Sequence, residues 1–301
     1  MDLRQLGALV AVADHRSFSA AARSLHTVQS NVSTHVARLE RELGVILVDR
    51  ATGQLTPEGQ AVVSRARRIQ GELEALVADV AAVNSEITGV ARIGVIGTTA
   101  RWLVPPLLEA MAAEYPRVRV VVVDATTTSL LPQVHSGQLD LAVLALPVHD
   151  PDVDAELLFE EELLVIAPLD HPLAQHERVT LSQLAEHELL LEPPGTAFRD
   201  DLDTQATEAG VVLATKAEVD GMRLVASLAF EGFGAAVLPA SAAPRASGAW
   251  RVVGVDGLTR RSVGLVRRRR GLPSAPARAL TDVLRRTIAA EAERQPGIFG
   301  A

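Results

Sequence analysis

The sequence predicts a multidomain protein of mixed α and α/β class, and three observations predict it. Three short helical patterns and a hairpin pattern lie within the first 57 residues, which is typical of a winged helix-turn-helix. A heptad pattern then runs through residues 58–88 and predicts a long coiled-coil linker helix. From residue 89 to residue 301 strand and helix patterns alternate, which predicts a two-lobed α/β domain.

Length and composition agree with several folded domains. The chain has 301 residues, 48% of them apolar, which is enough for two domains of roughly 100–200 residues each. Charged residues make up 22% and are spread along the chain, so no apolar run reaches the about 18 residues of a membrane span. The first apolar run, residues 6–13, contains Gly7 and has no cleavage site after it. We therefore expect a cytoplasmic protein without a signal peptide or a membrane partner.

Charge and cysteine content limit which partners and which reactive sites the chain can have. The net charge is -8, but residues 1–56 carry six Arg against five acids, a balance of +1. Residues 57–89 carry three Arg against five acids, or -2, which leaves -7 for the remainder. The acidic total therefore does not exclude nucleic acid as a partner of the N-terminal head. The chain has no cysteine, which removes disulfides, thiol nucleophiles and cysteine zinc sites.

The N-terminal elements follow from apolar spacing and caps. Ser17 is a plausible N-cap for a helix over residues 18–25, and a third helix is predicted over residues 29–43. Gly44 ends that helix, since glycine adopts the left-handed C-cap conformation without strain. Residues 45–48 and Leu55 flank a turn and predict a small hairpin. The helical spacing appears in Leu3, Leu6, Leu9, Val10 and Ala13, and again in Val32, Val36, Leu39 and Leu43.

The linker helix begins at a strong start signal, Thr56-Pro57-Glu58, and we expect it to end at Gly89. Its apolar positions alternate in steps of four and three over more than three heptads, a pattern that favours pairing of two copies of the chain. An amphipathic helix packed on its own domain is the alternative. The predicted dimerisation seam comprises Val62, Ala66, Ile69, Leu73, Leu76, Val80, Val83 and Ile87.

The α/β part predicts two lobes with a cleft between them. The first lobe is expected over residues 89–161 and 268–301, and the second over residues 162–267. Clefts between such lobes usually hold a small ligand. Strands are predicted at 92–96, 118–123, 139–145, 157–167, 189–191, 214–219, 235–238 and 262–268, and helices at 101–113, 129–135, 199–209, 222–231 and 275–293.

Several motifs together resemble those of LysR-type transcriptional regulators. The head carries Ser17-Phe18-Ser19-Ala20-Ala21-Ala22-Arg23-Ser24-Leu25, followed by Gln29, Val32-Ser33, Leu39-Glu40, Leu43-Gly44, Leu47, Arg50, Leu55-Thr56 and Gly59. Downstream lie residues 94–105, Ser136-Gly137-Gln138-Leu139-Asp140-Leu141-Ala142, Asp170-His171-Pro172-Leu173 and residues 232–239. Each motif is weak by itself, but together they occur in the family's order over nearly the whole chain.

The resemblance implies a bacterial DNA-binding transcriptional regulator. Its C-terminal part would be an effector-binding domain of the periplasmic-binding-protein-like type, and its partners promoter DNA, a small-molecule effector and further copies of the chain. The resemblance implies a homodimer through the linker helix that often assembles into a homotetramer. RNA polymerase is a further possible partner. Neither a cofactor nor a metal is implied.

The helix over residues 29–43 is the predicted recognition helix. Its inward apolar positions leave one polar face open, and the first residues of such a helix lie nearest the major-groove floor. We assign base contacts to Gln29, Ser30, Ser33 and Thr34, and phosphate contacts to Arg38 and Arg50. His35 is a further candidate for DNA contact. Ordinary exposed helix residues are the alternative interpretation. Many relatives carry Pro where this chain has Ser30 and a basic residue where it has Thr34. The operator preference of those relatives therefore does not transfer to this chain.

The effector cleft is expected where strands of the two lobes end. The resemblance points to the turns at Thr98-Thr99 and Thr126-Thr127, whose hydroxyls and free backbone N–H groups favour an anion. Helix capping alone is the alternative role for these threonines. In the second lobe, Phe198 and Arg199 open a helix, and Arg199 offers a fork for a carboxylate. Pro147, Met222 and Phe233 are candidate apolar walls, and a small carboxylate or similar polar metabolite is the expected effector.

Other functions find less support. The sequence lacks the usual nucleophile, nucleotide and zinc motifs, so we expect no enzyme and assign no catalytic residue. His171 and His176 lack clustered ligands, and the basic run at residues 267–270 is interpreted as a solvated surface. A solute-binding protein would use the two lobes but not residues 1–88. A purely structural coiled coil would leave the cleft without a role.

Overall fold

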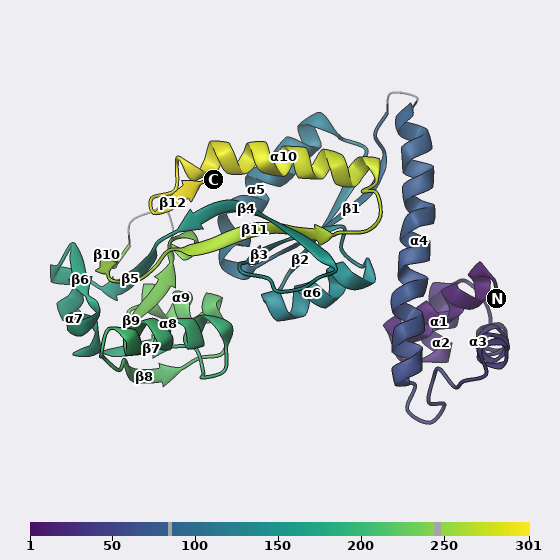
Figure 1. Cartoon of the computed structure of the whole chain (residues 1–301), viewed down its shortest axis with the longest axis horizontal. Coiled ribbons are helices and arrows are strands. Elements are labelled where there is room, and N and C mark those ends of the chain that lie inside the picture. Colours follow the sequence, from purple (N-terminus) through teal and green to yellow (C-terminus); the bar gives the residue numbers. More distant parts are fainter. Residues whose placement is uncertain (84–85, 244–247) are drawn as a thin grey trace.

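The computed structural model describes residues 1–83, 86–243 and 248–301. A helical head and a long helix stand at one end of the molecule, and two α/β lobes extend from them (Figure 1). The head contains α1 (Leu3–His15), α2 (Phe18–Ser24) and α3 (Gln29–Leu43). The Ser17 hydroxyl accepts from the Ala20 N–H, and Gly44 has φ +71°, so both predicted caps are confirmed.

The head has its own core, formed where the three helices meet the first turns of the linker helix. The predicted hairpin forms a single bridge between Val48 and Leu55, flanked by backbone hydrogen bonds from the Asp49 N–H to the Gln54 carbonyl and from the Thr56 N–H to the Leu47 carbonyl. Gly59 lets the linker helix approach this segment, since a Cβ there would overlap the Leu47 carbonyl oxygen. The buried core residues include Leu6, Leu9, Val12, Val32, Val36, Leu39, Leu47, Val63 and Ala66.

The linker helix is α4 (Pro57–Val83). Its start is confirmed, with the Gly59 N–H donating to the Thr56 hydroxyl at 3.0 Å. Its end differs from the prediction, because Gly89 opens the first strand. The predicted dimerisation seam includes Ile87, but this residue lies outside α4 and packs, half-buried, on the core of the first lobe. The heptad spacing therefore continues past the helix, where tertiary packing uses the apolar residue differently.

The first lobe is built on a six-stranded sheet in the order β12-β4-β11-β3-β1-β2. Strands β1 (Gly89–Val95), β2 (Val118–Asp124) and β3 (Leu141–Ala145) are parallel, as the alternating pattern predicts. Strands β4 (Val153–Glu161), β11 (Arg261–Arg268) and β12 (Ile298–Gly300) join them antiparallel. The helices of this lobe are α5 (Gly97–Glu114), α6 (Thr127–Ser136) and α10 (Ala275–Ala292).

The second lobe has a sheet in the order β6-β10-β5-β9-β7-β8. Its strands are β5 (Leu163–Pro168), β6 (Arg178–Thr180), β7 (Glu188–Leu191), β8 (Ala214–Glu218), β9 (Ala235–Pro239) and β10 (Trp250–Asp256). Its helices are α7 (Leu181–Ala185), α8 (Ala197–Glu208) and α9 (Met222–Phe230), with short 3-10 turns η1 (Pro172–Gln175) and η2 (Ala240–Ala242).

Two predictions for the α/β part are wrong. The single strand expected over residues 157–167 is two strands, because the chain passes between the lobes at Glu162. One apolar run thereby supplies β4 to the first sheet and β5 to the second. The chain returns earlier than expected, since β11 pairs with β3 and β4. Residues 261–267, assigned above to the second lobe, thus belong to the first.

The linker helix docks on the first lobe through charged contacts. Arg92 of β1 pairs with Glu74 of α4 at 3.0 Å. Asp79 accepts from the Ala275 N–H at 2.8 Å and from Arg278 Nη2 at 3.2 Å, both at the start of α10. These contacts orient α4 relative to the sheet of the first lobe. None of the described helices is both long and apolar enough to span a membrane.

Candidate functional site

The start of α3 presents a polar surface outward from the head. Gln29, Ser30 and Thr34 are exposed and Ser33 is half-buried, while Val32 and Val36 point into the core. The Gln29 side-chain oxygen accepts from the Ser19 hydroxyl at 3.0 Å, which orients the amide. The Thr34 hydroxyl donates to the Ser30 carbonyl at 2.8 Å, so its free lone pair faces solvent as an acceptor. The predicted base-contacting side chains therefore share one accessible face.

Arg50 lies beside this face in the wing, the short hairpin closed by the bridge between Val48 and Leu55. Its Nη2 donates to Glu40 Oε2 at 2.7 Å, and its guanidinium lies 4.8 Å from the centre of the Phe18 ring. Glu40 also accepts from the Leu47 N–H at 3.0 Å, which ties α3 to the wing. The Arg50 side chain remains 45% exposed, so it keeps donors for a phosphate. Arg38 is exposed on α3.

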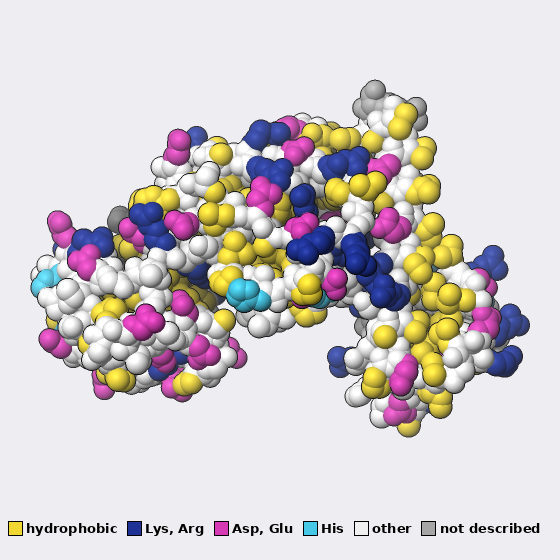
Figure 2. Space-filling model, in the orientation of Figure 1, with side chains coloured by type: hydrophobic (Ala, Val, Ile, Leu, Met, Phe, Trp, Pro, Cys, Tyr) yellow, Lys and Arg dark blue, Asp and Glu magenta, His cyan; other side chains and the backbone are white. Residues whose placement is uncertain are grey.

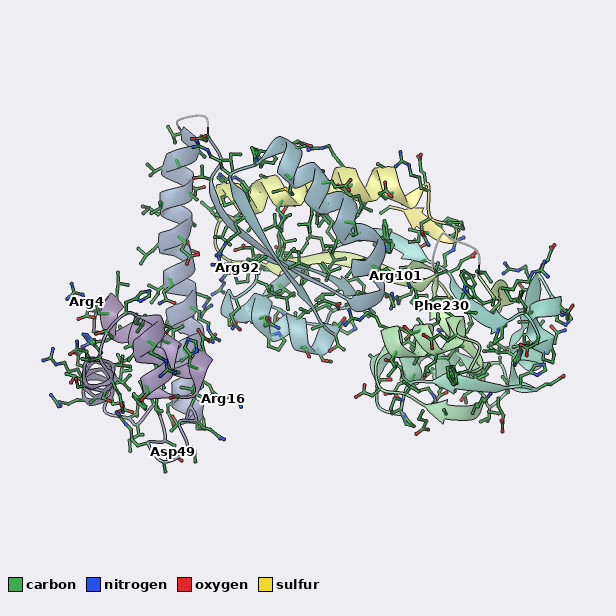
Figure 3. The ribbon with its side chains drawn as sticks, turned by 180° about the vertical axis from the view of Figure 1, so that it is seen from behind. Arg4, Arg16, Asp49, Arg92, Arg101 and Phe230 are labelled. Atoms are coloured by element: carbon green, nitrogen blue, oxygen red, sulfur yellow. The ribbon has the colours of Figure 1, made fainter. Side chains whose placement is uncertain are left out.

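His35 occupies a different environment from the other α3 candidates. It is half-buried, and its Nδ1 atom has no hydrogen-bond partner among the described residues. It lies near Asp2 at the start of α1, where a hydrogen bond from the Gln5 N–H chiefly lowers the pKa of Asp2 and His35 adds to the shift. The structure therefore separates His35 from the open face. Sequence reasoning did not select Arg4 and Arg16, two exposed cations of the head (Figure 3).

In the first lobe, the predicted threonine turns lie at the carboxyl ends of β1 and β2. Thr98 and Thr99 are buried in the first turn of α5, and the Thr98 hydroxyl accepts from Arg261 Nη2 at 3.0 Å. The Thr99 hydroxyl is fully buried and finds no partner in the described part of the chain. The Thr126 hydroxyl lies 2.9 Å from that of Thr128. None of these threonines caps its helix through the side chain, so capping alone does not account for them.

Two acids that the sequence reasoning missed line the same region. Glu161 is fully buried, and its Oε1 accepts from Arg261 Nε at 2.9 Å. Burial raises the pKa of Glu192, and the nearby Asp220 carboxylate raises it further. The N–H groups of Gly221 and Met222, where α9 begins, act in the opposite direction. The sequence signal for Glu192 was available, because it is an acid directly after the buried strand β7.

Side chains from α9 bridge the two lobes. Arg223 forms an ion pair with Asp124, which ends β2 in the first lobe. Farther along α9, the Phe230 ring lies 5.6 Å from the guanidinium of Arg101 in α5, and Figure 3 shows these two residues on facing elements. The two contacts hold the lobes together across the predicted cleft. A ligand there must therefore fit within, or displace, an existing polar network.

Arg199, predicted to hold a ligand carboxylate, is engaged within its own lobe. It is 8% exposed, and its Nε donates to Asp203 Oδ2 at 2.7 Å. Its Nη1 donates to the Glu192 carbonyl at 2.9 Å. The Arg199 guanidinium thus has no free pair of N–H donors for a ligand carboxylate in this structure. It instead positions the backbone at Glu192. The expectation of an open fork overlooked the i,i+4 acid on the same helix.

Of the predicted apolar walls, Phe198 and Met222 line one small pocket with Arg199, whereas Pro147 and Phe233 lie outside that pocket. Phe198 packs, half-buried, on the core of the second lobe, and Met222 opens α9. Phe233 lies beyond the opposite end of α9 and is 57% exposed. Pro147 is exposed after β3. The structure therefore does not bring Phe233 and Met222 together, because a helix of nine residues separates them.

Family models match both parts of the chain. Residues 3–60 match the model described as "Bacterial regulatory helix-turn-helix protein, lysR family". Residues 84–289 match the model described as "LysR substrate binding domain". The matched ranges together cover nearly all of the head and most of both lobes.

Known proteins are similar to the chain over most of its length. The chain is 32% identical over 296 residues to the DNA-binding transcriptional dual regulator OxyR of Escherichia coli K12, covering 96% of this chain and 95% of that one. It is 37% identical over 245 residues to a probable hydrogen peroxide-inducible genes activator of Streptomyces viridosporus, covering 80% and 78%. The structure of a full-length OxyR variant from Pseudomonas aeruginosa matches with a TM-score of 0.74 and 27% identity, covering 96% and 94%.

Proposed function

Because this chain belongs to the LysR family of bacterial transcriptional regulators, we propose that it binds promoter DNA through α3 and that a small effector between the two lobes modulates this binding. The open polar face of α3 carries the DNA-binding part of the proposal, since Gln29, Ser30 and Thr34 all lie exposed on it. Glutamine and hydroxyl side chains at the start of a recognition helix are suited to read base edges.

Footprinting on the promoter region of the protein's own gene tests this function. We expect protection of paired half-sites, since two heads in a dimer would contact the same face of the duplex. Loss of protection in a Gln29→Ala, Ser33→Ala variant that keeps its unfolding midpoint would support base reading by α3. Protection that is unchanged in this variant would contradict the assignment.

For the effector, we propose a small carboxylate or similarly polar metabolite. Support comes from the partnerless hydroxyl of Thr99, the free N–H groups in the first turn of α5 and the nearby guanidinium of Arg261. Calorimetric titration with a panel of carboxylates and neutral analogues tests the class. A Thr99→Val variant should weaken a carboxylate ligand and leave the unfolding midpoint nearly unchanged. If every strong binder is neutral and apolar, the proposed class is wrong.

A relative named above is described as a probable hydrogen peroxide-inducible genes activator, so we ask whether this regulator could also respond to peroxide through thiol oxidation. Oxidation of a protein thiol by peroxide requires a cysteine, and this sequence has none. We therefore propose that this regulator responds to a reversibly bound ligand and not to thiol oxidation. Treatment with hydrogen peroxide should leave promoter affinity unchanged at doses that do not oxidise its three methionines. A peroxide-dependent change in affinity without methionine oxidation, checked by mass spectrometry, would contradict this.

Assembly through α4 is also part of the proposal. Ile69, Leu73, Leu76, Val80 and Val83 of the predicted seam are all exposed in the single chain, from 40% to 84%. Val62 and Ala66 instead pack on the head core, so they support the head and not a partner helix. We propose a homodimer through the exposed part of the seam, further pairing into a homotetramer, and contact with RNA polymerase in the cytoplasm, where promoter DNA lies.

A further inference from the structure

We propose that a second ligand site lies between α4 and the first lobe and binds a small organic polyanion that carries phosphate or carboxylate groups. A cavity of about 760 Å³ separates the middle of α4 from the sheet. This volume falls within the range of about 300–1,000 Å³ typical of ligand sites. The site goes beyond the effector cleft, because β1 contributes its first residues to this cavity and leads to the cleft at its other end.

Both sides of the cavity come from separate parts of the chain. Small residues of α4, Gly71, Ala75 and Ala78, leave space along the helix. The opposite side is formed by the start of β1, the end of β11 and the loop at 269–274. Figure 2 shows dark blue side chains gathered beside α4 on this side of the first lobe. A ligand here would touch the linker and the effector-binding domain together.

Arginine dominates the charge of the lining. Six arginines face four acids there: Arg92, Arg119, Arg267, Arg268, Arg269 and Arg270 against Glu72, Glu74, Asp140 and Asp154. Arg92 and Arg269 are paired, with Glu74 at 3.0 Å and Asp154 at 2.8 Å. The other four arginines have no carboxylate within 4 Å in the described ranges. Glu156 lies near Arg267 and Asp140 near Arg268, but neither forms an ion pair with it, so these guanidinium groups keep N–H donors for an incoming anion.

Neighbouring groups add to the positive potential. Arg268 Nη1 lies so close to Gly137 that a Cβ there would overlap it, and Arg68 of α4 approaches the same glycine. Burial lowers the pKa of Arg68, and repulsion from Arg65 and Arg268 lowers it further. The nearby Asp152 carboxylate acts in the opposite direction but does not cancel this shift. Cations crowded in this way favour a bound anion that relieves their repulsion.

The chemistry of the lining indicates the ligand class. Guanidinium groups bind phosphate and carboxylate through paired N–H donors. A single inorganic ion would leave most of the volume empty. Apolar atoms of Val77, Leu272 and Pro276 also face the cavity, so an organic body fits beside the charged groups. A multiply charged metabolite with a compact apolar part satisfies both kinds of surface.

DNA is a less suitable occupant. The basic run at residues 267–270 is solvent-accessible, as the sequence pattern predicts, with Arg267, Arg269 and Arg270 exposed, and it also lines the cavity. Figures 1 and 3 place α3 on the far side of α4 from the first lobe. A duplex seated on α3 would therefore not reach the cavity of the same chain. Binding of a small anion would instead strengthen the docking of α4 on the first lobe.

Calorimetry on the full chain at about 0.15 M salt tests the site, because this ionic strength screens weak surface binding. Sodium triphosphate and citrate are the probes, which distinguish phosphate from carboxylate, and acetate and glucose are the controls. We expect saturable binding of at least one polyanion with one site per chain. An Arg268→Ala, Arg270→Ala variant should lose at least tenfold in affinity. Arg286→Ala, which removes an exposed arginine outside the cavity, should bind like the unaltered chain.

Hydrogen exchange supplies a second readout. Bound triphosphate or citrate should slow exchange in residues 71–78 of α4 and leave the turn at Thr98 unaffected. If the double variant fails to fold, Arg119→Ala, at an exposed position, takes its place in the same titration. Absence of saturable binding, or equal affinity in the cavity variants and Arg286→Ala, would overturn the proposal. Thr99→Val should retain triphosphate binding, so failure at this site is distinguishable from failure of the effector cleft.

Discussion

Arg261 and Glu161 pair where the chain crosses between the two lobes. The two residues are register partners at the ends of β11 and β4, and Arg261 Nε lies 2.9 Å from Glu161 Oε1. Glu161 is fully buried and also accepts from the Ser241 N–H at 2.8 Å. Because Arg261 donates to Thr98 as well, one guanidinium connects both crossing strands to the first turn of α5. The hinge, meaning the two strand ends where the chain crosses between the lobes, thus shares one polar network with the candidate effector cleft.

Replacing Arg261 should strongly destabilise the protein. Arg261→Met leaves the Glu161 carboxylate buried without its counter-charge, which typically costs about 3–5 kcal/mol of unfolding free energy. Denaturant unfolding measures the loss. Arg178→Met, which removes one partner of an exposed ion pair with Asp256, is the matched control and should change little. Equal stability of the two variants would show that the hinge pair contributes no more than a surface pair.

Arg50 should act on DNA affinity without reading sequence. Arg50→Ala is expected to weaken binding similarly on all duplexes and to reduce the slope of log affinity against log salt by about one. The reason is its position beside α3, where the exposed guanidinium reaches a phosphate and not a base. Fluorescence anisotropy at several salt concentrations measures both quantities. A loss confined to one duplex sequence would instead indicate a base contact.

Gln29 provides the contrasting case. Gln29→Ala should cost about 1–3 kcal/mol on the preferred site and much less on unrelated DNA, because the amide reads a base edge. The same anisotropy titration with specific and random duplexes tests this. The salt slope should stay constant, since no charge is removed. A uniform loss on both duplexes would rule out a base-reading role for this residue.

The exposed seam of α4 should determine assembly. Leu76→Arg, Val80→Arg places two charges where each side chain is 61% exposed in the single chain, and burial of unpaired charge against a second helix is unfavourable. We expect dissociation to monomers and weaker promoter binding. Sedimentation velocity measures the assembly. Val212→Arg, at an exposed apolar residue of the second lobe, is the control, and a dimer that persists in the double variant would exclude this seam.

The buried Asp140 carboxyl should contribute less to stability as the pH rises. Burial chiefly raises the pKa of Asp140 above its usual 3.8, so the folded state holds its proton to higher pH than the unfolded chain does. The stability that Asp140 contributes is therefore fully present below pH 3.8 and is lost as the pH rises through the raised value. Asp140→Asn keeps an acceptor for the Arg92 N–H and should be more stable at neutral pH. Thermal unfolding from pH 4 to 7 measures this.

The exposed residue Asp282 supplies the control for that series. Asp282→Asn should follow the pH dependence of the unaltered chain, whereas Asp140→Asn should show a smaller decline. A decline that is the same in both variants would mean that the buried carboxyl is not its source.

Local patterns in the sequence determined much of the architecture. Apolar spacing and caps located α1, α2 and α3, the start of α4 and the parallel strands β1, β2 and β3, because helix and strand periods depend on residues close together in the chain. The same patterns selected the accessible face of α3. They also predicted two lobes, since alternating strands and helices require a sheet covered by helices.

Tertiary structure decided what depends on residues distant in sequence. The sequence patterns divided the lobes at residues 161–162 but did not reveal that the apolar run there forms two separate strands. The heptad did not reveal that Ile87 packs on the first lobe. The engagement of Arg199, the pairing of Glu161 with Arg261 and the arginine-lined cavity beside α4 were likewise hidden. The periodicity of apolar residues shows which face of a helix or strand is buried. It does not show which side chains will form contacts when they lie 100 residues apart, as Glu161 and Arg261 do, because those contacts form only when the elements pack together.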